Sequence, residues 1–68
     1  MEKIILHTVR FRQPQTYEFG PDDIGVAVAC ALDGIYENCF SMEKITDEKG
    51  NLILDENGII DYAYKNGF

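Results

Sequence analysis

The sequence predicts an α+β fold, in which a small antiparallel sheet of two hairpins packs on one central helix, with a short C-terminal helix or a fifth strand. Two patterns lead to this expectation. Runs that alternate apolar and polar residues stand near both ends of the chain, and a helical apolar periodicity stands between them. The length of 68 residues fits a single domain spanning residues 1–68.

The N-terminal part of the chain predicts a hairpin. Residues 3–11 are rich in β-branched and aromatic side chains, which favour a strand. Alternation places Ile5, His7, Val9 and Phe11 on one face of this strand, and Ile4, Leu6, Thr8, Arg10 and Arg12 on the other. We expect Pro14 to break the run, because proline cannot donate to a strand ladder. Residues 16–19 are then expected to form a second short strand.

A central helix is predicted from Ile24 to about Glu37. The segment 20–23, Gly-Pro-Asp-Asp, has the composition of a helix start, since proline fits the first helical position and acids favour the first turn. One continuous apolar arc of the helix is expected to lie on the sheet; it collects Ile24, Ala27, Val28, Ala31, Leu32, Ile35 and Cys39.

The C-terminal part predicts a second hairpin, with strands over residues 40–46 and 51–54. Between them, residues 47–50 have the sequence Asp-Glu-Lys-Gly. This is the chemistry of a bulged turn in which the glycine takes the left-handed position.

Residues 59–66 allow two interpretations. Ile60, Tyr62 and Tyr64 alternate as they would in a strand. A helix is instead favoured by Asp55, which can cap its start, and by the glycine at position 67, which can end it. The helix is the preferred interpretation.

Charge is distributed unevenly along the chain. Twelve Asp and Glu residues against six Lys and Arg residues give a formal net charge of -6. Residues 1–16 hold three bases and one acid, a net of +2, whereas residues 17–68 hold eleven acids and three bases, a net of -8. Such a field repels nucleic acid and steers the molecule toward basic partners. Lys3, Arg10 and Arg12 are interpreted as bases that solubilise an edge hairpin, not as nucleic-acid contacts.

Catalytic, metal-binding and targeting motifs are weakly represented in the sequence. Cys30 and Cys39 are nine residues apart and belong to no Cys-x-x-Cys pair, and His7 is the only histidine. We therefore expect reduced thiols, no metal and no cofactor. An EF-hand register fails at both acidic turns, because lysine or isoleucine stands where an oxygen ligand is required. The chain has neither a membrane-spanning run nor a signal-peptide pattern, so we expect a cytoplasmic protein without membrane contact.

Acidic residues on the outer helix face and in the turns form the predicted partner-binding set. On a helical wheel, Val26, Ala29 and Cys30 form a small apolar strip opposite the core arc, and carboxylates frame it. An apolar centre with a charged rim suits a protein contact surface. With the turn acids, the set comprises Asp22, Asp23, Val26, Asp33, Glu37, Asp47, Glu48, Asp55 and Glu56.

These features predict a non-enzymatic interaction protein that binds a basic protein surface. In the sharpest form of this hypothesis, carboxylates stand in for backbone phosphates and compete with nucleic acid for a DNA- or RNA-binding partner. In size and acidity the chain is similar to the small acidic proteins that phages and mobile elements encode to bind host proteins, which implies an inhibitor that mimics nucleic-acid charge. A homodimer is compatible with the sequence. The alternative is a small-ligand-binding or thiol-dependent enzyme that uses Cys30, Cys39 and His7.

Overall fold

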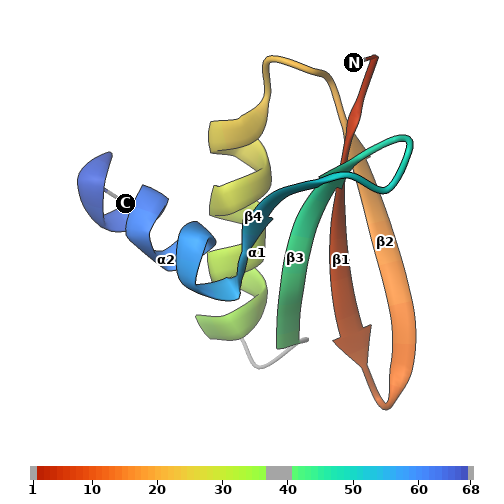
Figure 1. Ribbon diagram of the computed structural model, residues 1–68. Helices are drawn as coiled ribbons and strands as arrows, with labels where there is room; N and C mark the ends of the chain where they lie inside the picture. The colour runs from red at the N-terminus through yellow and green to blue at the C-terminus, as the bar shows by residue number, and fades with distance from the viewer. Residues whose placement is uncertain (1, 37–40, 68) are drawn as a thin grey trace.

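Four strands and two helices follow one another in the order β1, β2, α1, β3, β4, α2 (Figure 1). The computed structural model describes residues 2–36 and 41–67. The elements are β1 Ile4–Arg10, β2 Gln13–Phe19, α1 Ile24–Tyr36, β3 Ser41–Asp47, β4 Leu52–Asp55 and α2 Glu56–Lys65. The strands pair antiparallel in one sheet, and both helices lie on the same side of it. The predicted α+β fold, with the sheet packed on the central helix, is confirmed.

The sheet has the strand order β2-β1-β3-β4, so the two hairpins meet where β1 pairs with β3. The register places Leu6 opposite Tyr17 on β2 and opposite Ile45 on β3. Partners across a ladder share a face of the sheet. Ile4, Leu6 and Thr8 are buried on the face that the helices cover, whereas the alternating residues of β1 point to the other face.

The β1–β2 turn differs from the sequence prediction. The reversal occurs at Phe11 and Arg12, and β2 begins at Gln13, so Pro14 lies within the strand. Pro14 stands opposite Val9. In a hairpin with a two-residue loop, the pair that flanks the loop is hydrogen-bonded and the next pair is not, so proline costs this ladder no bond. Pro14 instead removes a donor from the outer edge of the sheet.

Helix α1 begins at Ile24, as predicted, but the segment 20–23 lies before the helix and does not form its first turn. Asp23 is the residue that caps the helix, because its carbonyl accepts the amide of Ala27 at 2.9 Å, and Pro21 lies in the turn before it. Proline therefore does not occupy the first helical position. Of the residues predicted to lie on the sheet, Ala27, Val28 and Ala31 are buried, while Ile24 and Leu32 are half-buried against the core. The predictions for the Ile35 side chain and for Cys39 lie outside what the structure describes.

The C-terminal segment is a helix, as preferred from the sequence. The turn before β4 has Gly50 at φ 89, the left-handed position predicted for it. Asp55 caps α2, since its Oδ1 accepts the amide of Gly58 at 2.7 Å. Ile59 and Ala63 are the buried residues of α2, one turn apart on the face that meets the sheet and α1. The helix ends before Gly67, which has φ 77.

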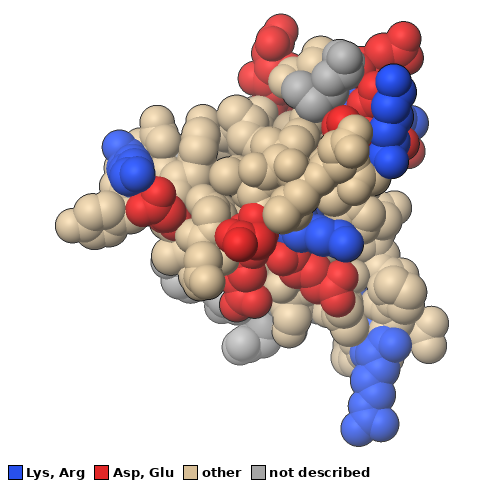
Figure 2. Space-filling view, viewed as in Figure 1, with Lys and Arg blue, Asp and Glu red and all other residues tan. Residues whose placement is uncertain are grey.

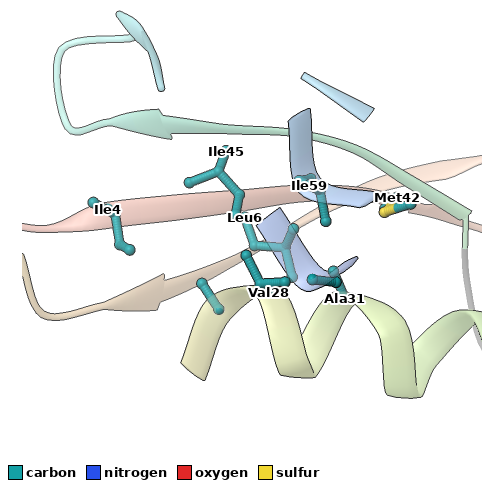
Figure 3. Packing of buried hydrophobic residues seen from close by; sticks show 9 residues of the cluster. Ile4, Leu6, Val28, Ala31, Met42, Ile45 and Ile59 are labelled. Carbon is teal, nitrogen blue, oxygen red and sulfur yellow. The ribbon is translucent and has the colours of Figure 1, made fainter. Parts of the chain in front are cut away.

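The core lies between the sheet and the two helices (Figure 3). It comprises Ile4, Leu6, Ala27, Val28, Ala31, Met42, Ile45, Ile59 and Ala63. Burying a valine, leucine or isoleucine fully contributes about 1.5–3 kcal/mol, so one small cluster contributes most of the hydrophobic stabilisation of a chain this short. On the opposite face of the sheet, Ile5, His7 and Val9 are half-buried, and neither of the two described helices covers that face.

Candidate functional site

The outer face of α1 projects away from the sheet because Ala27, Val28 and Ala31 fill the inner face. Val26 is 56% exposed there, and Asp33 is exposed seven residues further along the helix. The half-buried Ala29 and Cys30 flank Val26 on the helix, although Cys30 also packs against the core and is not a purely outer residue. An apolar strip beside a carboxylate is therefore present on the surface. Glu37, the other predicted residue of this face, lies outside the described residues.

At the start of α1, the two aspartates differ. The Asp23 carboxylate accepts the amide of Gly20 at 3.2 Å, and this bond closes the turn that leads into the helix. A methyl group on Gly20 would lie 2.9 Å from the same carboxylate oxygen, so glycine suits this close approach. Asp22 is exposed and forms no side-chain hydrogen bond or ion pair with another described residue. Of these two aspartates, Asp22 is the one whose exposed carboxylate has no partner among the described residues.

The acidic side chains of the β3–β4 turn accept hydrogen bonds from groups within the protein. The Asp47 carboxylate accepts the amides of Lys49 and Asn51 at 2.9 and 2.8 Å, and the Asn51 side chain at 2.9 Å. The Asn51 side-chain bond is the main reason that the pKa of Asp47 is lowered. The Glu48 carboxylate accepts the amide of Glu2 at 3.1 Å, which ties the N-terminus to this turn. Hydrogen bonds from its own amide and then from Glu2 lower the pKa of Glu48.

The two acids at the start of α2 also differ. Asp55 is engaged as the cap of the helix. Glu56 is exposed in the first turn, where the aligned amide dipoles favour a negative charge. Of the predicted set, the described residues that remain for a partner are Asp22, Val26, Asp33 and Glu56.

The sheet separates the residues of the alternative thiol site. His7 lies on the face of the sheet away from α1, where its Nε2 lies 2.8 Å from Thr46 Oγ1. The Thr46 hydroxyl donates to the carbonyl of Asp47, so it must accept from His7, which is therefore in the Nε2–H form. Cys30 is on α1, on the other side of the sheet. Burial, and then the charge of Asp33, raise the pKa of Cys30, so the nucleophilic thiolate is disfavoured. Cys39 lies outside the described residues.

Residues 2–36 and 41–67 contain neither a metal-ligand cluster nor a membrane-spanning helix. Within these ranges, no three His, Cys, Asp or Glu residues come together in a way that could hold a metal ion. Neither described helix has the length and apolar character needed to cross a bilayer.

The sequence prediction missed the tip of the β1–β2 hairpin. Phe11 and Arg12 have φ 53 and 64, and Phe11 is 85% exposed. The Arg10 guanidinium carbon lies 5.4 Å from the centre of the Phe11 ring, a cation–π arrangement. Positive side chains project from this end of the sheet in Figure 2, apart from the acidic groups. The sequence does contain a signal for this turn, because Phe11 and Arg12 separate two strand-like segments. Pro14 obscures it, since proline near the start of the second segment argues against a strand.

No protein-family model, no curated protein and no solved structure matches this chain.

Proposed function

We propose that this chain is a non-enzymatic cytoplasmic interaction protein that binds a basic protein surface through the outer face of α1. The observation that carries the proposal is the surface around Val26. Val26 is exposed and Asp33 stands on the same side of the helix, while Asp22 precedes its start. This is the arrangement of an apolar centre with a charged rim.

The net charge of the chain supports a basic partner. Nine of the eleven described acids are exposed, and the other two are half-buried. Ion pairs with lysine involve two of them, Glu18 with Lys3 and Asp61 with Lys65. The remaining exposed carboxylates give a negative field that raises the association rate with a positive surface.

The sharpest form of the proposal is competition with nucleic acid. Asp33 lies ten residues after Asp23, the cap of α1, which is about 15 Å along the helix, and Asp22 lies in the turn just before it. Duplex DNA presents one negative charge per ~1.7 Å of axis. The α1 face therefore imitates a short, sparse stretch of phosphates, and the partner would be a DNA- or RNA-binding protein whose basic groove it occupies.

Affinity capture followed by a binding titration tests this proposal. The protein is used as bait in its native cytoplasm at low and at high salt, and the proteins that elute are identified. The captured partner is then titrated with wild type and with Asp33→Asn, Glu37→Gln. We expect the double variant to bind at least about tenfold more weakly, with a shallower salt dependence, because it loses contact charges.

The matched control is Glu2→Gln, Glu18→Gln, which removes two negative charges near the start of β1 and the end of β2. It should retain most of the affinity. Equal affinities for wild type and the α1 variant, with equal salt slopes, would exclude the outer face of α1 as the binding surface. A partner displaced by a DNA or RNA oligonucleotide supports the mimic; one that is unaffected limits the proposal to an acidic contact surface.

A further inference from the structure

The hairpin tip Arg10-Phe11-Arg12 has three features that folding stability does not explain. The Phe11 side chain stands almost fully in solvent. Phe11 and Arg12 both adopt left-handed backbone conformations, which residues with a Cβ disfavour. Neither arginine forms an ion pair with any residue in the described ranges. Strained backbone that presents an unburied aromatic side chain points to recognition.

The tip lies far from the acids at the other end of the sheet. The register places Ile4, at the start of β1, beside Phe19 and Asp47. The tip follows Arg10, six residues further along the strand, which is about 20 Å at 3.3 Å per residue. The Debye length at physiological ionic strength is ~8 Å, so those acids are largely screened at the tip, while Glu43 of β3 lies nearer to it along the sheet.

We propose that the hairpin tip of one copy docks on the outer face of α1 in a second copy of this chain. The inference rests on the proposed function, because it assigns an occupant to the same acidic face. The chain carries both halves of such a contact. One half is an exposed aromatic ring with an arginine before and after it in the chain, and the other is the exposed Val26 with an exposed aspartate before and after it in the chain.

The two surfaces carry opposite charges around an apolar centre. Asp33 lies seven residues after Val26, about 10 Å along α1, and Asp22 lies in the turn just before the helix. A Phe11 ring that covers Val26 places the flanking arginines toward the two acids, where a guanidinium can bind a carboxylate with two hydrogen bonds. Aromatic and arginine side chains are the usual anchors of protein interfaces.

A second copy fits better than nucleic acid or a bilayer. An extended polyanion would be repelled by the whole acidic molecule, which has a net charge of -6. A protein surface, in contrast, can present its carboxylates only where the tip docks. Reciprocal exchange of two tips makes a closed dimer, since both contacts are then identical. Such small contacts are weak, so the dimer should form only at high concentration.

Sedimentation velocity measures this association directly. Wild type is studied at concentrations up to about 1 mM at about 0.15 M salt, where distant charges are screened. We expect dimer formation in wild type. In Phe11→Asn and in Arg10→Gln, Arg12→Gln, the dissociation constant should rise at least about tenfold. Asparagine tolerates the left-handed turn, so the first variant keeps the hairpin.

Two control variants match these changes. Tyr64→Gln removes an aromatic ring that is 87% exposed on α2, and Lys44→Gln, Lys49→Gln removes the same charge elsewhere. Both should dimerise as wild type does. Arg12→Glu and Asp33→Arg should each weaken dimerisation alone, whereas an equimolar mixture should restore it, because each mixed pair has one native and one reversed contact.

Three outcomes would overturn the inference: a wild type that stays monomeric at the highest concentration, a dimer that the tip variants do not weaken, or arginine-dependent binding of a single-stranded 12-nucleotide DNA probe at the tip. The proposed function fails separately. Arg10→Gln, Arg12→Gln keeps the acidic face and should still bind the captured basic partner. Suppose that the wild type dimerises but no captured partner depends on Asp33 for binding. This result would reject the proposed function and leave the inferred self-association standing.

Discussion

Single acidic side chains in this protein perform two different tasks. Asp23 and Asp55 accept backbone amides at helix starts, and Asp47 does so in a turn. Removing a cap of this kind costs about 0.5–2 kcal/mol, so a loss of binding in such a variant would be confounded with a loss of stability. Asp22 and Asp33 have no such task among the described residues, and they are therefore the informative positions for binding experiments.

The sequence alone does not show which acidic side chains bind backbone amides within the fold and which remain available to a partner. Glu48 accepts the amides of Glu2 and Lys3, which are 46 and 45 residues away along the chain. Contacts of this range depend on how the strands pair, and the alternation of a single strand carries no information about that pairing. The exposure of the Val26 strip could be anticipated, because it follows from helical periodicity alone.

The Asp47 carboxylate should make stability depend on pH. Its pKa lies below the ordinary value in the folded state, chiefly because the Asn51 side chain donates to it. The stabilisation is therefore complete above the unfolded-state pKa, near 4, and is lost as the pH falls through the folded-state pKa. Thermal melts between about pH 6 and 2 should show a steeper loss of Tm for wild type than for Asp47→Asn.

Asn51→Ala provides the control for this prediction. It removes the side-chain donor while leaving Asp47 ionisable, so its pH dependence should lie between those of wild type and Asp47→Asn. Melting curves of the three proteins that run parallel with pH would show that the turn carboxylate does not couple folding to protonation.

At the level of elements, the periodic segments and the Gly50 turn were predicted well, whereas the β1–β2 reversal was not. The alternation in residues 3–11 and the apolar arc of residues 24–36 are repeated signals, and the structure contains both elements. The β1–β2 reversal was misplaced because two-residue hairpin turns usually contain glycine or asparagine, whereas this one contains Phe11 and Arg12. Pro14 predicts a strand end, and only its pairing position opposite Val9 shows why β2 continues through it.

Relieving the strained turn should stabilise the protein. The double variant Phe11→Asn, Arg12→Gly installs the sequence that this turn geometry prefers. Left-handed conformation costs an ordinary residue about 1–2 kcal/mol, while glycine has an entropic cost of about 0.5–1 kcal/mol, so we expect a gain of about 1–2 kcal/mol. Urea denaturation measures it. Arg10→Gln, outside the left-handed turn, should change the free energy of unfolding by less than about 0.5 kcal/mol. If the double variant had the same free energy of unfolding as wild type, the turn would not be strained.

Two adjacent isoleucines test how α2 is held. Ile59 is fully buried in the core, whereas its neighbour Ile60 is 49% exposed. Ile59→Ala should cost about 2–5 kcal/mol, because it leaves a cavity in a small core. Ile60→Ala should cost less than about 0.5 kcal/mol and serves as the matched control. Equal effects in urea denaturation would show that α2 does not dock through Ile59.

The whole molecule is polarised, with a basic hairpin tip and an acidic remainder. Residues 1–16 carry a net of +2 and residues 17–68 a net of -8. The uneven charge was apparent from the sequence, but its spatial separation depends on the sheet, which extends the tip away from the other end of β1. A molecule with this charge distribution can bind partners of either sign at different ends, which is why the two proposed contacts require separate variants.

Surplus negative charge should also weaken the fold at low salt. The exposed acids Asp22, Asp33, Glu43 and Glu56 have no ion pair with another described residue, so their mutual repulsion is relieved on unfolding. Raising the salt concentration from about 10 to about 150 mM shortens the Debye length from ~30 to ~8 Å and should raise the Tm. The variant Asp22→Asn, Glu43→Gln, Glu56→Gln should melt at a higher temperature in low salt and respond less to added salt. If the Tm of wild type fell with salt instead, the Lys3–Glu18 and Lys65–Asp61 pairs would outweigh the repulsion, and the acidic surface would be in internal balance rather than available to a partner.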